Sequence, residues 1–523
     1  MKIHPLLFIL CLAIPLQAGA QRNVLLIIAD DLGTDYCGFY ENHLDTAAMP
    51  NVRSLSGRGV RFINAWSNPI CSPTRAGMLT GRYSFRTGVG DAVGPGSAVL
   101  DTAEITIPRV LNHFFPGQIA KANIGKWHLH NPMPLSNLAF PIQMGYDLYT
   151  GSFSGVLPDY YNWKKVVNGV NTTVTNYATT ETTNDAIAWV KTQPNKPFFL
   201  WLAYNAPHTP LHLPPAGLHS YTNLSGTAAD IAAQPKEYFK ASLEALDHEI
   251  GRLFDSLAVL NRLDSTDIIF IGDNGDDPAV NQNQGSAKGS INQEGVSVPF
   301  IIAGPSVVNP GRMSTALVNT QDLFATILEL FGCTDWKSLI PVAKPVDAKS
   351  IVPILTLTAA DIRPWAFTEV FKTVPVAGDG KTMRNKVFKL LKYDNGNEAF
   401  YNLSNDPTEN NNLLLGNWNG NQQANYEYLC NEMTNLVGMG NYCTPSVSTE
   451  TPVANEVISA FPNPFEDHII LKNAAIDADL ELSNAIGQII FSGKNIEKQD
   501  FSSLPKGLYF LKISGKTLVK LFK

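Results

Sequence analysis

Four continuous apolar runs constrain the fold of this chain more than any other feature of its sequence. They cover residues 24–29, 198–203, 267–271 and 298–303. A short run that is apolar at nearly every position is typical of a strand buried on both faces. Between the second and third runs, residues 237–260 carry apolar side chains at helical spacing. This alternation predicts a doubly wound α/β fold, in which helices flank a large sheet.

Composition narrows the class of protein. A chain of 523 residues with 44% apolar and 16% charged side chains is expected to be globular and to contain several domains. The formal net charge of -7 argues against a nucleic-acid partner, because phosphate binding requires a basic surface. An anionic substrate would therefore need a local cluster of cations.

The first 20 residues have the pattern of an export signal. Lys2 precedes an apolar stretch over residues 6–14, and small residues at 18–20 provide a cleavage site. The alternative is a membrane anchor, but the stretch is shorter than the roughly 20 residues that span a bilayer. We therefore expect an exported protein without a transmembrane anchor. In an oxidising compartment Cys430 and Cys443 could form a disulfide, because they are close in sequence.

Polar pairs follow two of the apolar runs. Asp30 and Asp31 follow the first run, and Asp273 and Asn274 follow the third. Taken alone, such a pair is more often a helix cap or a solvated turn than a ligand site. Ligands of open α/β sheets bind at the carboxyl ends of strands, however, and four oxygen donors suit Ca²⁺ or Mg²⁺ better than Zn²⁺.

A short segment from Cys71 to Arg75 predicts a helix start. Ser72 is expected to cap the helix and Pro73 suits its first turn, which places Cys71 at the positive end of the helix dipole. Arg75 would then reach back to Cys71. The alternatives are a buried structural cysteine and an ordinary surface salt bridge of the arginine.

Further basic and imidazole side chains follow other predicted strands. Residues 117–124 form a weaker strand that runs into Lys126 and His128, which would face the same side because they are two residues apart. His208 follows the run 198–203. Nearby aromatic and imidazole side chains would line a pocket or serve in packing; they are Tyr160, Tyr161, Trp163 and His212.

Several strings together resemble the formylglycine-dependent sulfatase family, which belongs to the alkaline phosphatase-like superfamily. Cys71-Ser72-Pro73-Thr74-Arg75 is followed by Leu79-Thr80-Gly81-Arg82, and Gly125-Lys126-Trp127-His128-Leu129 forms a second motif. The resemblance covers roughly residues 23–415. It implies a large mixed sheet flanked by helices, and a Cys71 that a formylglycine-generating enzyme oxidises to formylglycine.

The resemblance also assigns roles to individual positions. It implies that Ca²⁺, with Mg²⁺ as the alternative, is held by Asp30, Asp31, Asp273, Asn274 and the modified Cys71. It implies a hydroxyl of the hydrated aldehyde as the nucleophile and His128 as the base that regenerates the aldehyde. The full catalytic set is Cys71, Arg75, Lys126, His128, His208 and Lys288. One departure stands out, since Ser297 occupies the position of an arginine in the family pattern.

The C-terminal third divides further. Residues 386–393 and 398–403 predict a hairpin, and the string from Tyr401 to Leu413 resembles the small α+β subdomain of sulfatases, with its antiparallel sheet. Motifs from Pro462-Asn463-Pro464 to Leu504-Pro505-Lys506-Gly507 resemble a type IX secretion sorting domain with a small β-sandwich fold; a carbohydrate-binding sandwich is the alternative. We expect a signal peptide at 1–20, a catalytic domain at 21–345, a subdomain at 346–443, a linker at 444–456 and a sorting domain at 457–523.

Together these features predict a secreted or surface sulfatase, exported through the periplasm by the type IX machinery. Its expected substrates are sulfate esters of polysaccharides or glycans. Two alternatives stay open at this point. One is a phosphate or phosphonate ester hydrolase of the same superfamily, and the other is an inactive glycan-binding surface protein.

Overall fold

The computed structural model describes residues 22–40, 43–282, 287–438, 442–443, 459–472, 478–485, 487–513 and 517–523. The chain forms two compact units, Met1–Cys443 and Thr444–Lys523. The predicted signal peptide and linker lie outside the described residues. No helix in the described part of the chain combines the length and apolarity that crossing a membrane requires.

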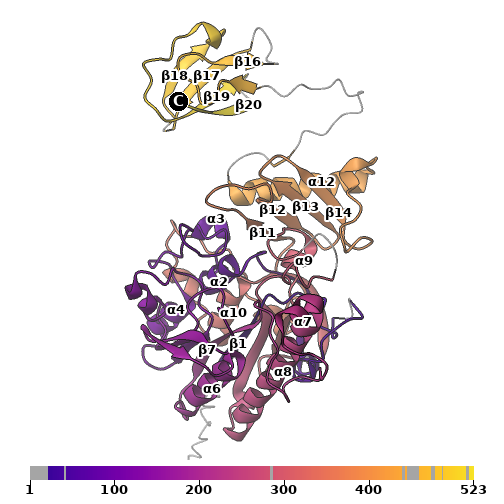
Figure 1. Cartoon of the computed structure of the whole chain (residues 1–523). Helices are drawn as coiled ribbons and strands as arrows, with labels where there is room; N and C mark the ends of the chain where they lie inside the picture. Colours follow the sequence, from indigo (N-terminus) through magenta and orange to yellow (C-terminus); the bar gives the residue numbers. More distant parts are fainter. Residues whose placement is uncertain are drawn as a thin grey trace, which may run out of the picture. The chain divides into compact units, whose positions relative to one another are not determined.

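The first unit is built on a ten-stranded mixed sheet (Figure 1). Its centre is parallel and has the order β8-β1-β7-β3-β4. These strands are β8 (Thr266–Gly272), β1 (Asn23–Asp30), β7 (Phe198–Pro207), β3 (Ala120–Gly125) and β4 (Leu148–Gly151). The remaining strands are β2 (Gly59–Trp66), β5 (Trp163–Val167), β6 (Val170–Val174), β9 (Phe300–Ala303) and β10 (Arg312–Asn319).

The mixed sheet flanked by helices confirms the predicted α/β fold class. The doubly wound pattern inferred from the four apolar runs needs one correction, which concerns the direction of a strand. The last apolar run forms β9, which lies antiparallel to both of its neighbours, β2 and β8. An all-apolar run indicates burial on both faces and carries no information about strand direction.

Two apolar cores explain why the first run is apolar at every position. Val24, Leu26 and Ile28 of β1 face one core, and the alternate residues Leu25 and Ile27 face the other. The first core includes side chains of α2 (Cys71–Thr80), α4 (Ile107–Phe114) and α10 (Asp322–Leu330). The second is covered by α1 (Pro50–Gly57), α6 (Ala178–Lys191) and α8 (Pro235–Val259).

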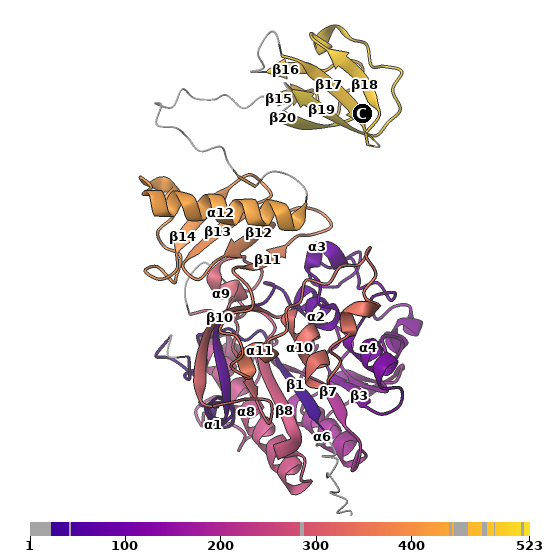
Figure 2. The ribbon, with the colours of Figure 1, turned by 180° about the vertical axis from the view of Figure 1, so that it is seen from behind.

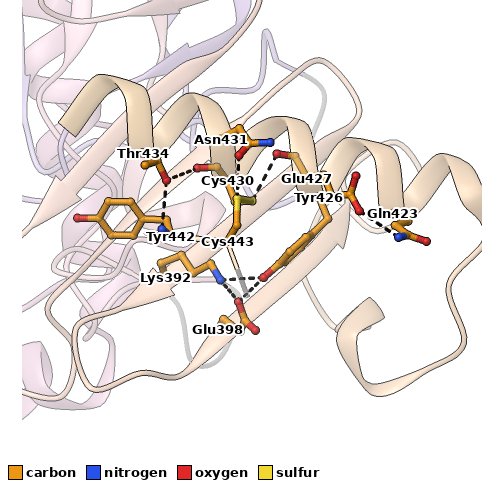
Figure 3. The surroundings of a disulfide bond; sticks show 10 residues. All are labelled: Lys392, Glu398, Gln423, Tyr426, Glu427, Cys430, Asn431, Thr434, Tyr442 and Cys443. Carbon is orange, nitrogen blue, oxygen red and sulfur yellow. Dashed lines mark hydrogen bonds and ion pairs between the residues drawn. A yellow bond between two sulfur atoms is a disulfide. The ribbon is translucent and has the colours of Figure 1, made fainter. Parts of the chain in front are cut away.

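A four-stranded antiparallel sheet completes the first unit (Figure 2). It comprises β11 (Ala366–Val370), β12 (Gly380–Arg384), β13 (Phe388–Tyr393) and β14 (Glu398–Asn402). The helix α12 (Gly420–Val437) packs Leu429 and Met433 against Leu390 and Phe400 of this sheet. Cys430 of α12 forms a disulfide with Cys443 (Figure 3).

The second unit has a core of its own. Its strands are β15 (Ser459–Phe461), β16 (Ile470–Lys472), β17 (Leu480–Asn484), β18 (Ile489–Gly493), β19 (Leu508–Ile513) and β20 (Thr517–Phe522). β15 pairs with β16, and the other four form an antiparallel sheet of order β18-β17-β19-β20. Phe465, Ile469, Leu482 and Leu511 are buried between them.

Short helices connect these elements. They are α3 (Ser84–Thr87), α5 (Phe140–Gln143), α7 (Ala228–Ala233), α9 (Gln293–Val296), α11 (Val352–Leu355), and the 3₁₀ turns η1 (Leu135–Ala139), η2 (Leu263–Ser265), η3 (Trp336–Leu339), η4 (Leu413–Leu415) and η5 (Ile496–Lys498).

Candidate active site

A cluster of carboxylates lies where β1 and β8 end. Asp30 is the last residue of β1, Asp31 follows it with a left-handed φ of 62°, and Asp273 follows β8. All three are fully buried. The Asp31 backbone N–H donates to Asp273 Oδ1 over 3.1 Å, and Asn274 Nδ2 donates to Asp31 Oδ1 over 2.8 Å. The structure thus brings the four predicted oxygen ligands to one place.

The donor set fits a hard cation. Asp30 Oδ1 and Asn274 Oδ1 are buried oxygens without a hydrogen-bond partner among the described residues. Single ligand atoms of Asp30, Asp273 and Cys71 lie within 4.8 Å of one another. Burial, opposed by the charge of Lys126, raises the pKa of Asp30 to about 8. Orphaned oxygens and a carboxylate that resists ionisation indicate that this cluster needs an additional positive charge, which Ca²⁺ or Mg²⁺ would supply.

The candidate nucleophile opens a helix. α2 begins at Cys71, whose Sγ lies 3.2 Å from Nδ1 of His128. Burial raises the pKa of the Cys71 thiol although Lys126 opposes this. Because the thiolate is the reactive form of cysteine, the unmodified side chain would be a poor nucleophile here.

The predicted capping role of Ser72 is wrong. The residue before the helix is Ile70, and no side chain caps it. The Ser72 hydroxyl instead donates to the carbonyl of His128 over 2.8 Å and accepts from the N–H of Val93 over 3.0 Å. Ser72 therefore ties the start of α2 to two distant loops, which no local pattern could indicate.

Arg75 forms a buried ion pair, so the surface salt bridge considered as an alternative is excluded. Its Nε and Nη2 donate to Asp273 Oδ2 over 2.9 and 2.7 Å, and both side chains are fully buried. Nη1 donates to the carbonyl of Lys126 over 3.0 Å, and Nη2 lies 3.6 Å from Asp30. The Arg75 side chain thus extends towards Cys71 as predicted, but it bonds to the carboxylates beside that residue.

Lys126 and His128 both point into the cluster, but strand alternation is not the reason. β3 ends at Gly125, where a Cβ atom would lie 1.9 Å from the carbonyl oxygen of Ala203, and His128 has a left-handed φ of 54°. Lys126 Nζ donates to Asp30 Oδ2 over 2.6 Å. Burial, together with the charges of Lys126 and Arg75, holds the pKa of His128 well below its usual value. A neutral imidazole beside Cys71 can accept a proton.

His208 and Lys288 form the opposite side of the cluster. Lys288 Nζ lies 2.7 Å from Asp31 Oδ1 and 3.0 Å from His208 Nε2. Burial lowers the pKa of His208 to about 4, although Asp31 opposes this shift. Burial lowers the pKa of Lys288, but the nearby acidic groups, led by Asp31, together outweigh it and raise the pKa. Lys288 is therefore a cation and His208 a neutral partner at rest.

Neighbouring loops hold these side chains and were not identified from the sequence. His128 Nε2 lies 3.1 Å from the carbonyl oxygen of Val93, and Gly155 packs directly against the imidazole ring. Tyr160, a candidate pocket residue, is buried and donates towards the carbonyls of Asn205 and His208 at 2.7 Å each. Its ring stacks on His212 at 3.8 Å, so packing accounts for this pair.

The remaining candidates from the sequence also lie in packed surroundings. Trp163 is buried and its indole donates to the carbonyl of Asn176, while the partly exposed Tyr161 donates to the carbonyl of Leu213. Ser297 lines a cavity of about 370 Å³ with Asp35, Glu294 and Arg384, and none of the six catalytic candidates lines that cavity. The departure from the family pattern therefore lies at this cavity.

Comparisons with known proteins identify relatives for both units of the chain. A model of the sulfatase family matches residues 22–333, and a model of the secretion system C-terminal sorting domain matches residues 459–523. N-acetylgalactosamine-6-sulfatase of Homo sapiens is 28% identical over 376 residues, which cover 65% of this chain and 67% of that protein. Choline-sulfatase of Rhizobium meliloti (strain 1021) is 26% identical over 404 residues, covering 65% and 75%.

Solved structures show the same fold. The structure of Ps i-CgsB in complex with k-i-k-neocarrahexaose has a TM-score of 0.66 at 24% identity and covers 82% of this chain and 95% of its own. The structure of BT4656 in complex with D-glucosamine-2-N,6-O-disulfate has a TM-score of 0.63 at 22% identity, with coverage of 80% and 98%.

Proposed function

Because the chain belongs to the sulfatase family of sulfuric ester hydrolases and carries a secretion sorting domain, we propose that it is an exported enzyme that removes sulfate from sulfated polysaccharides or glycans. One observation carries this proposal. Cys71 at a helix start lies in a single buried cluster with the cations Arg75, Lys126 and Lys288, two imidazoles and three carboxylates. Such an arrangement suits a substrate with a compact negative charge.

Two groups would complete the site. Asp30, Asp31, Asp273 and Asn274 would hold Ca²⁺, with Mg²⁺ as the alternative, and the cation would supply positive charge for the sulfate oxygens. Position 71 would be converted to formylglycine by a formylglycine-generating enzyme, and its hydrated form would supply the hydroxyl that attacks sulfur and an oxygen for the metal. The orphaned oxygens and the high pKa of the Cys71 thiol support this reading.

The chain's own side chains would perform the remaining steps. Lys126 and Lys288 are positively charged neighbours that would neutralise sulfate oxygens in a buried site. Lys288 Nζ would give a proton to the oxygen of the leaving alcohol, either directly or through His208 Nε2, which lies 3.0 Å from Lys288 Nζ and could take up the lysine proton and pass it on. His128 Nδ1, which lies beside position 71, would accept a proton when sulfate leaves. Arg75 would orient Asp273 and the Lys126 backbone.

A carbohydrate substrate is favoured by two findings. Of the two similar solved structures described above, one is a complex with k-i-k-neocarrahexaose and the other is a complex with D-glucosamine-2-N,6-O-disulfate. The sorting domain at 459–523 supports export of the protein to the cell surface or the medium, where an enzyme can bind large glycans. We further propose export through the periplasm by type IX machinery, with a signal peptide at 1–20, a catalytic domain at 21–345, a subdomain at 346–443, a linker at 444–456 and a sorting domain at 457–523.

The proposal is tested by ester selectivity. Protein co-expressed with a formylglycine-generating enzyme is offered 4-nitrophenyl sulfate, the matching phosphate and phosphonate esters, and a panel of sulfated polysaccharides. We expect sulfate release from the aryl sulfate and from at least one glycan, and none with Cys71→Ala. Preferred turnover of a phosphate or phosphonate ester would overturn the sulfate assignment, and glycan binding without turnover would indicate a binding protein.

A further inference from the structure

Glu409 belongs to the Asp406-Pro407-Thr408-Glu409 string, which follows β14 in the first unit and to which the reaction assigns no role. The side chain of Glu409 is only 2% exposed. Its Oε2 accepts hydrogen bonds from Asn292 Nδ2 over 2.7 Å and from the backbone N–H of Gln293 over 2.8 Å. Glu409 therefore binds Gln293, the first residue of α9, and Asn292, which precedes that helix.

The second oxygen of Glu409 takes part in a buried ion pair. Lys389 Nζ on β13 lies 2.6 Å from Glu409 Oε1, and the side chain of this lysine is fully buried. The same ammonium lies 4.9 Å from the centre of the Trp66 ring, whose Nε1 donates to Gln293 Oε1 over 3.2 Å. The buried ion pair with Lys389 thus fixes Glu409. The start of α9 is held by both Glu409 and Trp66, because each of them bonds to Gln293.

The segment between α9 and Lys288 is short and tightly closed. Asn292 Oδ1 accepts from the Ser290 hydroxyl over 2.7 Å. A Cβ atom at Gly295 would lie 2.0 Å from the carbonyl oxygen of Ser290, so the loop has no room to shift inward. Gly289 N–H donates to the carbonyl of Pro69 over 2.8 Å, two residues before Cys71. A displacement of Asn292 and Gln293 would therefore be transmitted to Lys288.

We propose that Glu409 is a positioning residue, which acts from the loop after β14 through Asn292 and Gln293 to hold Lys288 against the reaction centre. The inference rests on the proposed function, in which Lys288 meets the substrate. It gives the region around the small antiparallel sheet an indirect part in catalysis: Lys389 of β13 holds Glu409, which lies in the loop after β14 and fixes the loop of a catalytic lysine.

The test removes the carboxylate without leaving a buried charge behind. Glu409→Ala/Lys389→Met deletes both members of the ion pair, because a lone buried charge would destabilise the fold. Glu409→Gln/Lys389→Met keeps an acceptor oxygen and is expected to recover activity. The matched control is Glu398→Ala/Lys392→Met, which deletes a neighbouring pair that contacts Tyr426 on α12.

The decisive readout is a cycle with Lys288→Ala on 4-nitrophenyl sulfate. We expect Glu409→Ala/Lys389→Met to lower kcat/KM by roughly 10- to 100-fold in the parent enzyme. In the Lys288→Ala background the same double substitution should lower kcat/KM by less than about threefold, because the lysine that Glu409 positions is no longer present. Equal losses in both backgrounds, or an equal loss in the matched control, would overturn the proposal.

Two further measurements keep the proposal testable if the double variant is unstable or the substrate is different. Asn292→Ala leaves the ion pair intact and should show the same dependence on Lys288. Hydrogen exchange of residues 287–296 in Glu409→Ala/Lys389→Met should accelerate, whereas the control should not change it; unchanged exchange would refute the coupling. An inactive parent enzyme with accelerated exchange would count against the sulfatase proposal alone.

Discussion

Gly155→Ala tests whether the position of the His128 ring controls turnover. Gly155 follows β4, and a Cβ atom there would lie 2.3 Å from both Cε1 and Nε2 of His128. Ordinary contacts of a Cβ begin at 3.4 Å. The ring cannot yield freely, because its nitrogens lie 3.2 Å from Cys71 Sγ and 3.1 Å from the Val93 carbonyl oxygen. One added methyl group must therefore displace the imidazole or the loop.

The expected magnitude follows from that displacement. The ring must move by about 1 Å, and misplacements of this size cost on the order of 100-fold in rate. Overpacking should also lower the free energy of unfolding by about 1–3 kcal/mol. The assay is kcat for 4-nitrophenyl sulfate, normalised to the fraction of position 71 that is modified, with thermal unfolding alongside.

Gly94→Ala is the matched control for this prediction. It lies in the neighbouring loop, and its Cβ would meet only Ser97 Oγ at 3.8 Å, which is an ordinary contact. We expect the control to retain the parent rate. If Gly155→Ala turned over at the parent rate with a full content of modified residue, the claim that the His128 position limits catalysis would be refuted.

Three further predictions concern the metal, pH and the disulfide. Asp273→Ala should lose bound Ca²⁺ and most activity together, because it removes a ligand and the partner of Arg75; full activity after exhaustive chelation would contradict the metal site. Burial raises the pKa of Glu369 to about 7, so the stability that its neutral form contributes is present below pH 4.5 and is lost as pH rises to about 7. Glu369→Gln should therefore be more stable than the parent by up to about 3 kcal/mol at pH 8 and similar at pH 4, and equal unfolding curves at pH 8 would disprove this. Cys430→Ser opens a disulfide with a sequence separation of 13 residues (Figure 3) and should lower the stability of the first unit by about 3 kcal/mol in thermal unfolding, without changing kcat.

The sequence predicts much of the fold because burial leaves a direct trace in it. The run from Val24 to Ala29 is apolar at each position since its two faces meet two cores. The polar pairs could be placed together because parallel strands end at one edge of a sheet. The direction of β9 could not be predicted, since an apolar run reads the same in both directions.

The site was predictable where chemistry sits at strand ends and unpredictable where distant segments meet. Asp30 and Asp273 follow buried strands, so their neighbourhood could be inferred. Ser72 has the sequence of a helix cap, but the carbonyl of His128 and the N–H of Val93 offer it better partners. Gly155 contacts His128, which is far along the chain, and no local pattern marks it; Glu409 lies in a recognised string, but its contacts with Asn292 and Gln293 could not be read from that string.

The most direct test of the account is the chemical state of position 71. The enzyme is prepared with different extents of modification, the peptide that contains residue 71 is analysed by mass spectrometry, and sulfate release is measured on each preparation. We predict a peptide in which CHO replaces CH₂SH, with activity proportional to its fraction and absent in Cys71→Ser. A fully active preparation whose residue 71 is an unmodified thiol would contradict the account.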